Sequence, residues 1–228
     1  MPRRFRDRRE AGRALASALA CALGAARRRD GVVVALARGG VLVADEVARE
    51  LGMPLDVLAV RKVGHPLQPE YAIGAVAPGG DGVYVRASDG LTEAEIVAAV
   101  ERALAASEEL NRRLHERRAP VDVEGREVVL VDDGLATGAT MVAAIRWARG
   151  RGARRVVAAV PVAAAQSAAL IRSEADEFVC PVELEQYGSV GFSYEQFTQV
   201  GNDEVIRILG EAAARAPGPS PGDGASSL

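Results

Sequence analysis

An acidic pair followed by a loop of glycines and threonines is the segment best suited to chemistry. Asp132 and Asp133 follow a run of apolar residues, and the loop at residues 134–140 contains two glycines and two threonines. Glycines let the chain turn tightly, so that successive backbone N–H groups point into one concavity. A helix that starts near Thr140 would add its positive end to that concavity. This composition predicts a cradle for a phosphate group.

The carboxylates before the loop suit a sugar attached to that phosphate. An ionised aspartate only accepts hydrogen bonds, so Asp132 and Asp133 would bind the hydroxyls of a ribose. The segment lacks the Gly-Lys-Ser/Thr of a Walker loop and the GxGxxG of a dinucleotide site. The residues therefore predict a ribose 5-phosphate site. The alternative is an ordinary strand–turn–helix junction with incidental acidic residues.

Residues 128–140 resemble the signature with which type I phosphoribosyltransferases bind 5-phosphoribosyl-1-pyrophosphate (PRPP). The resemblance implies that Asp132 and Asp133 hold the ribose hydroxyls. It also implies that the following loop holds the 5-phosphate, through Ala136, Thr137, Gly138, Ala139 and Thr140. In this family the expected order along the chain is a pyrophosphate loop, a mobile loop and the PRPP loop, and candidates for all three occur in that order.

Residues 37–40 resemble the pyrophosphate loop of the family. The resemblance implies that Arg38 and Gly39 bind pyrophosphate, and that the Ala37–Arg38 peptide is a non-proline cis bond that exposes backbone donors. The alternative is a plain turn between a strand and a helix, with an exposed arginine.

The cations near residue 62 resemble the start of the mobile catalytic loop in some family members. Lys62 is the single lysine in a chain that otherwise uses arginine, and it lies beside Arg61 and close to His65. Departing pyrophosphate carries several negative charges, so cations that reach it in the transition state would speed the reaction. A solvated loop with incidental cations is the alternative. The second histidine, His115, lies in an arginine-rich segment and is expected to be solvated.

Two features bear on the acceptor. Ala136 stands where 6-oxopurine enzymes carry an acidic residue, so the sequence resembles adenine and uracil enzymes better at this position. Residues 183–202 form the expected base-binding hood and match no particular subfamily. Three aromatic side chains there, with Phe197 beside them, could stack on a planar base or pack the hood: Tyr187, Phe192 and Tyr194.

Strands that alternate with helices predict an α/β fold, with a mainly parallel sheet flanked by helices, a Rossmann-like core and a small irregular hood. Continuous apolar runs predict buried strands at residues 31–36, 54–62, 127–131, 156–162 and 177–182, with short strands at 72–77 and 82–86. Helices are expected within 14–26 and at 41–51, 92–114, 140–149, 163–172 and 203–215. Glycine and prolines predict a loop at 63–71.

The chain of 228 residues suits one domain. We expect residues 1–214 to form it, with a core at 31–182 and a hood at 183–202 that could include the N-terminal segment, before a disordered tail at 215–228. The net charge of −3 gives no indication of nucleic-acid or membrane binding. The two cysteines lie far apart, so neither disulfides nor a zinc site are indicated. A cytoplasmic protein is the default, and a homodimer is one assembly that the sequence allows.

The resemblance implies a Mg²⁺-dependent transfer of 5-phosphoribosyl from PRPP to a nitrogenous base, with release of pyrophosphate. Mg²⁺ would be held mainly by PRPP, and Asp132 and Asp133 are the candidates for direct contact. A non-catalytic PRPP-binding regulator is one alternative. A metal-dependent phosphohydrolase is another, although it would need further carboxylates or histidines.

Overall fold

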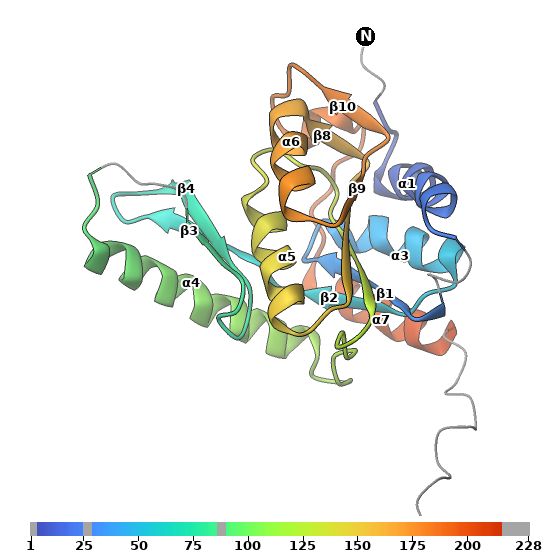
Figure 1. Ribbon diagram of the computed structural model, residues 1–228, viewed down its shortest axis with the longest axis horizontal. Helices are drawn as coiled ribbons and strands as arrows, with labels where there is room; N and C mark the ends of the chain where they lie inside the picture. Colours follow the sequence, from blue (N-terminus) through green and yellow to red (C-terminus); the bar gives the residue numbers. More distant parts are fainter. Residues whose placement is uncertain (1–3, 25–28, 86–89, 216–228) are drawn as a thin grey trace, which may run out of the picture.

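A parallel five-stranded sheet forms the centre of the computed structural model, which describes residues 4–24, 29–85 and 90–215 (Figure 1). Its strands, in spatial order, are β2 (Leu55–Leu58), β1 (Gly31–Leu36), β6 (Glu127–Val131), β7 (Arg155–Ala159) and β9 (Glu177–Val179). The chain runs outward from β1 to β2 and then returns across β1 to β6. The winding direction therefore reverses between β1 and β6, and ligands of open α/β sheets bind at the carboxyl ends of the strands at such a point.

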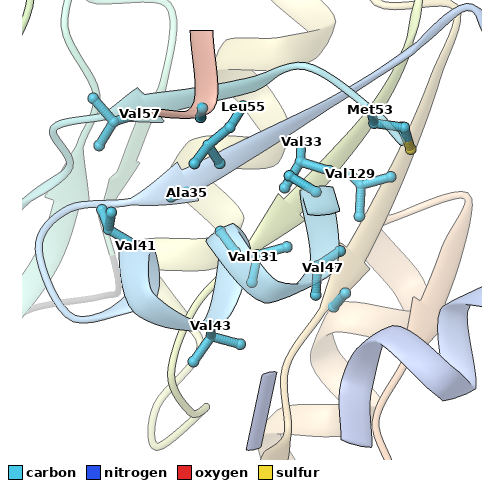
Figure 2. Close-up of a cluster of buried hydrophobic side chains, with 14 of the residues drawn as sticks. Val33, Ala35, Val41, Val43, Val47, Met53, Leu55, Val57, Val129 and Val131 are labelled. Carbon is cyan, nitrogen blue, oxygen red and sulfur yellow. The ribbon is translucent and has the colours of Figure 1, made fainter. Parts of the chain in front are cut away.

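The sheet is buried on both faces, as the apolar runs predicted. In β1, Val33 and Ala35 face one hydrophobic cluster while Val32 and Val34 face another. The first cluster includes residues of α1 (Arg8–Ala22), α3 (Gly40–Leu51) and α7 (Asn202–Arg215), and Figure 2 shows part of it. The second includes residues of α5 (Ala139–Gly150) and α6 (Ala165–Glu174). The expected helix–sheet–helix layering is confirmed.

An antiparallel hairpin extends beside the sheet, and it replaces the loop predicted at 63–71. It consists of β3 (Arg61–His65) and β4 (Gln68–Val76), with β5 (Val83–Val85) as a third strand. The prediction was wrong because tertiary packing outweighs the glycine and prolines: Val63 and Ile73 are buried against α4 (Glu93–Leu114). Helix α4 itself begins at the expected capping box of Thr92 and Glu95.

Three predicted strands are shorter than expected. The run at 54–62 divides into β2 and β3, since β2 ends at Leu58. The runs at 156–162 and 177–182 end at β7 and β9, and the chain then forms a separate parallel pair, β8 (Val162–Ala164) and β10 (Val182–Leu184). Pro161 and Pro181 mark both breaks. A proline cannot donate to a strand ladder, which accounts for the change of sheet.

The N-terminal helix begins earlier than expected. Helix α1 spans Arg8–Ala22, because Asp7 caps it by accepting a hydrogen bond from the Glu10 N–H. Residues 25–26 of the predicted helix, residue 86 of a predicted strand and nearly all of the predicted tail, 216–228, lie outside the described residues. In the described part of the chain, no helix is both long and apolar enough to cross a membrane.

His115 is buried, and the expectation that it is solvated was wrong. Its side chain is 6% exposed, and Nε2 lies 3.0 Å from Oδ1 of Asp56 on β2. Burial lowers the pKa of His115, but the hydrogen bond and charge of Asp56 outweigh burial, so the pKa lies above its ordinary value. No local pattern indicates this pair, because 59 residues separate the two partners.

Candidate functional site

The two candidate phosphate loops meet at the carboxyl ends of β1 and β6. Gly39 is in contact with Asp133: a Cβ added to Gly39 would lie 2.1 Å from Asp133 Oδ2. A Cβ on Gly40 would lie 2.6 Å from the Val131 carbonyl oxygen. Only glycine allows this approach. The Ala37–Arg38 peptide is cis, which confirms the expectation drawn from the family resemblance.

The loop after the acidic pair is held in shape by a glycine turn and by contacts with β8 and α6. Gly138 adopts a φ of 81°, a conformation that favours glycine, and it is the N-cap of α5. Leu135 pairs with Ala163, and the Ser167 hydroxyl donates to the Ala136 carbonyl. The start of α5 therefore points its free N–H groups towards the loop, as a phosphate cradle requires.

A pocket of about 170 Å³ lies over this loop and joins it to the hairpin. Its lining residues are Lys62, Asp132, Asp133, Gly134, Leu135, Ala136, Thr137, Gly138, Thr140, Met141 and Val190. Every candidate of the PRPP loop lines it except Ala139, which is buried in the core. The single lysine of the chain and the acidic pair therefore share one small cavity, although they come from different elements.

The acidic pair places two neighbouring carboxyl groups at the edge of the core. Burial, followed by the charge of Asp133, raises the pKa of Asp132 well above its ordinary value. Burial also raises the pKa of Asp133, while the nearby Arg8 guanidinium acts in the opposite direction. Lys62 favours the ionised form of Asp132. Hydroxyl donors or bound cations would therefore stabilise the ionised form of this pair.

Arg8 is a site residue that the sequence did not reveal. Its Nε donates to Asp133 Oδ2 at 2.7 Å, and the two side chains are 8% and 12% exposed. Its Nη1 donates to the Thr198 carbonyl at 2.7 Å. Because the N-terminal segment is rich in arginine, no local pattern distinguishes Arg8 from its neighbours.

The other candidate cations lie outside the pocket lining. Arg38 and Arg61 have exposed side chains. His65 lies near the tip of the hairpin, where Nδ1 accepts the Leu67 N–H at 3.1 Å and the ring meets Tyr71 edge-on. Of the predicted cations, the structure brings only Lys62 to the acidic pair.

The aromatic residues of the hood separate into two groups. Tyr187 and Phe192 line a second pocket of about 90 Å³, and the Tyr187 hydroxyl lies against Gly134. Tyr194 is 1% exposed, stacks on Phe197, and donates from its hydroxyl to the Asp133 carbonyl at 2.5 Å. Tyr194 therefore packs behind the acidic loop, whereas Tyr187 and Phe192 line the second pocket.

A larger groove of about 620 Å³ lies elsewhere, between the end of α4 and α7. It includes Arg118, whose guanidinium donates to the carbonyl of Leu55 at the amino end of β2. The groove therefore lies at the opposite end of the strands from the two loops. Size alone does not identify the site, and the convergent polar groups favour the smaller pocket.

Comparison with known proteins agrees with this geometry. The model of the "Phosphoribosyl transferase domain" family matches residues 5–196. Two Mycobacterium tuberculosis proteins, each named "Putative phosphoribosyl transferase", are 45% identical over 213 residues, which cover 91% of this chain and 47% of theirs. This chain thus spans about half the length of these curated relatives.

Two further matches differ in extent. The crystal structure of TT1426 from Thermus thermophilus has a TM-score of 0.76 and 41% sequence identity, over 91% of this chain and 98% of that one. The uracil phosphoribosyltransferase of Nocardioides sp. is 36% identical over 77 residues, 34% of this chain and 36% of that protein. The fold, the meeting of the two loops and the match over residues 5–196 lead to one conclusion: this chain belongs to the phosphoribosyl transferase domain family.

Proposed function

We propose that the protein transfers a 5-phosphoribosyl group from PRPP to a nitrogenous base and releases pyrophosphate. The observation that carries this proposal is the shared pocket, in which Lys62 of the hairpin faces Asp132, Asp133 and the loop at residues 134–140. A ribose with phosphate at one end and pyrophosphate at the other requires these groups: acceptors for its hydroxyls, a cradle for one phosphate and a cation for the other.

Each part of the pocket has a role in the proposed reaction. Asp132 and Asp133 accept hydrogen bonds from the ribose hydroxyls, and the 136–140 loop with the start of α5 binds the 5-phosphate. A base nitrogen bonds to C1 and releases its proton to solvent, while the bond from C1 to the pyrophosphate oxygen breaks and its electron pair leaves with pyrophosphate. Lys62, with Arg38 and Arg61 as further candidates, stabilises that leaving charge. Catalysis by such a site depends mainly on positioning.

The residues present fit a magnesium ion that is held mainly by the substrate. Asp133 Oδ2 already accepts a bond from Arg8. Within the described residues, no group of three or more histidine, cysteine, aspartate or glutamate side chains could hold a metal. The carboxylates of Asp132 and Asp133 are the available oxygen ligands. Mg²⁺ commonly uses one or two carboxylates together with substrate phosphates. When bound, the ion would neutralise charge on pyrophosphate.

The acceptor is best sought among adenine and uracil. Ala136 is exposed at the pocket and has no acidic group to handle the ring proton of a 6-oxopurine. The similarity to the Nocardioides uracil phosphoribosyltransferase, over about a third of the chain, supports the same choice. Tyr187 and Phe192 are the side chains that we propose to contact the base, since they line the hood pocket.

A base panel tests the proposed function. The protein is incubated with PRPP, Mg²⁺ and adenine, uracil, hypoxanthine, guanine or orotate, and pyrophosphate release is measured. Release with one base, together with formation of its nucleotide, is the expected result. PRPP binding without turnover on any base would favour a PRPP-binding regulator. Phosphate release without a base would favour a phosphohydrolase, and failure to bind PRPP would contradict the proposal.

A further inference from the structure

Arg8 is a buried arginine whose position is not explained by the stability of its own helix. It is the first residue of α1 and is 7% exposed. The helix dipole opposes a cation in the first turn, and a buried charge is costly unless it is paired and hydrogen-bonded. The explanation for Arg8 must therefore lie in the groups that it contacts outside α1.

Those groups belong to the acidic loop and to the hood. Besides its 2.7 Å bonds to Asp133 Oδ2 and to the Thr198 carbonyl, the Arg8 guanidinium carbon lies 3.8 Å from the centre of the Phe197 ring. A planar guanidinium presents several donors in a fixed fork, so one side chain can satisfy two acceptors and stack on an aromatic face. Arg8 thereby joins three segments that are distant in the sequence.

The two aspartates differ in the hydrogen-bond partners of their side chains. Asp133 Oδ2 meets Arg8 and the backbone of Gly39, and the Asp133 carbonyl accepts the Tyr194 hydroxyl at 2.5 Å. The hydrogen bond described for Asp132 comes from the neighbouring N–H of Asp133, at 2.8 Å. Among the described residues the two carboxylates thus differ: that of Asp133 accepts from a distant arginine that also contacts the hood, whereas that of Asp132 accepts from the adjacent backbone N–H.

From these contacts we infer that Arg8 is a positioning residue of the donor site, which fixes the Asp133 carboxylate for the ribose hydroxyls and links its orientation to the hood segment at residues 193–198. Arg8 does not line the pocket, so it acts through Asp133 and not on the ligand. The inference rests on the proposed function. Holding a binding group in one orientation before the ligand arrives reduces the entropy that binding must overcome.

PRPP binding to Arg8 variants tests this role. The dissociation constant for PRPP with Mg²⁺ is measured by calorimetry on the full chain, for the unaltered protein, Arg8→Gln and Arg8→Lys. Arg8→Gln is expected to weaken binding by about 10- to 100-fold, the effect of a small misplacement in a preorganised site. Arg8→Lys keeps the charge but not the fork, and should give an intermediate value. The control Arg13→Gln, at an exposed position of the same helix, should match the unaltered protein.

A double-mutant cycle separates positioning from a general effect on structure. If Arg8 acts through Asp133, Arg8→Gln should change PRPP affinity by no more than about twofold when it is added to Asp133→Asn. An undiminished loss in that background would overturn the inference, and so would unaltered affinity in Arg8→Gln alone. Circular dichroism and thermal midpoints without PRPP check that each variant is folded.

The design remains decisive if one variant does not fold. If Arg8→Gln does not fold alone, two other comparisons replace it. Arg8→Lys is compared with the unaltered protein, and Arg8→Gln/Asp133→Asn is compared with Asp133→Asn. The double variant is suitable because it leaves no buried unpaired charge. Equal PRPP affinity in Arg8→Lys and the unaltered protein, with a further loss in the double variant, would then overturn the inference. Failure of the unaltered protein to bind PRPP would contradict the proposed function itself, which distinguishes the two failures.

Discussion

Gly39 lies where the two candidate phosphate loops are in contact. A methyl group there would lie 2.1 Å from Asp133 Oδ2, so Gly39→Ala must displace either the carboxylate or the loop. We expect the variant to lose about 1–3 kcal/mol of the free energy of unfolding, as overpacked sites do. PRPP affinity should fall more than tenfold, since Asp133 would leave its binding orientation. Urea unfolding and calorimetry measure the two effects.

Gly210 provides a matched control for this substitution. It lies inside α7, and a Cβ added to it would meet no atom within 4 Å. Gly210→Ala should therefore stabilise the protein by about 0.5–1 kcal/mol, through helix propensity, and leave PRPP binding unchanged. Equal behaviour of the two alanine variants would contradict the close contact between Gly39 and Asp133.

The pair of His115 and Asp56 should make stability depend on pH. Because the pKa of His115 is higher in the folded protein than its ordinary value of 6.5, the pair contributes fully below about pH 6.5. That contribution is lost as the pH rises through the folded pKa. A hydrogen bond to a charged group contributes about 1.5–3 kcal/mol, so His115→Gln should lose about this much at pH 6 and less at pH 8.5.

Urea unfolding at the two pH values measures this prediction. Arg112→Gln is the control, since its side chain is 64% exposed on the same helix and pairs with an equally exposed Glu109. Its effect should be small and should not change with pH in this range. A His115→Gln variant that was equally destabilised at both pH values would show that the pair does not involve a protonated histidine.

At the scale of elements, the hairpin of β3 and β4 determines which of its cations reaches the pocket over the acidic loop. Lys62 pairs with Ala75 on the part of the hairpin close to the sheet, whereas His65 pairs with Gln68 beside the turn. Local composition predicted a loop here because it carries no information about the packing of Val63 and Ile73 against α4. Lys62 could be named as a candidate from the family resemblance and from its being the single lysine, but the strand that presents it could not be predicted.

The hairpin predicts different effects for two of its candidate residues, Lys62 and His65. Lys62→Ala should lower kcat by about 100-fold, as the loss of one group that stabilises transition-state charge does. KM for PRPP should change much less. His65→Ala should lower kcat far less, because His65 lies near the tip, with Nδ1 already accepting the Leu67 N–H. Steady-state kinetics of the two variants measure this, and equal losses would contradict the placement.

At the scale of the whole molecule, local pattern located the strands of the central sheet but not all of their ends, and it did not reveal the long-range contacts between side chains. The buried strands and the acidic loop follow from apolar runs and turn residues, since those signals lie within a few positions of one another. The Arg8–Asp133 pair joins residues 125 positions apart, and nothing near Arg8 indicates its partner. Pro161 and Pro181 were visible in the sequence, but a change of sheet is a tertiary event.

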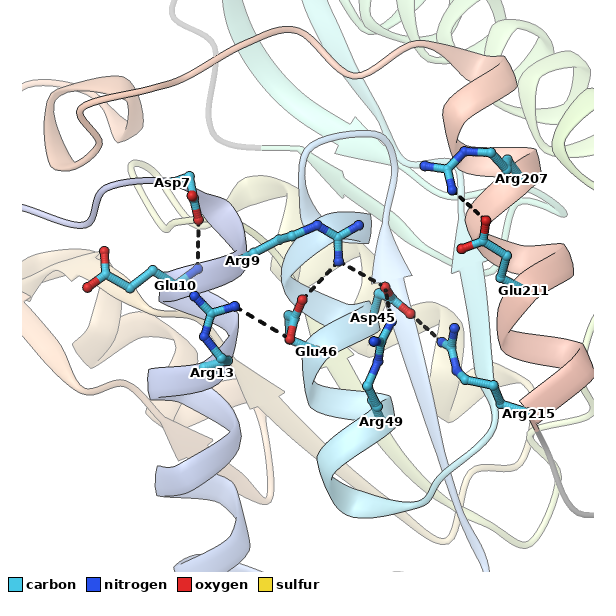
Figure 3. Close-up of polar contacts among 10 residues, drawn as sticks. All are labelled: Asp7, Arg9, Glu10, Arg13, Asp45, Glu46, Arg49, Arg207, Glu211 and Arg215. Atoms are coloured by element: carbon cyan, nitrogen blue, oxygen red, sulfur yellow. Dashed lines mark hydrogen bonds and ion pairs between the residues drawn. The ribbon is translucent and has the colours of Figure 1, made fainter.

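The two terminal helices are joined to the core by ion pairs around Asp45 of α3 (Figure 3). Asp45 is 1% exposed. Its carboxylate pairs with Arg9 of α1 at 3.2 Å, with Arg49 of its own helix at 3.1 Å and with Arg215 at the end of α7. One buried carboxylate thus links α1, which supplies Arg8 to the site, with the last described helix.

Asp45→Asn should therefore destabilise the whole domain. The substitution keeps the size of the side chain but removes the charge that pairs with three arginines. Each arginine is 35–52% exposed, so water can hydrate them and moderates the loss. We expect the free energy of unfolding, measured in urea, to fall by about 1.5–3 kcal/mol.

The control is Arg207→Gln, which breaks an exposed pair with Glu211 on α7 and should lower the free energy of unfolding by no more than about 0.5 kcal/mol. Equal losses in the two variants would show that α1 and α7 are held by their apolar faces alone.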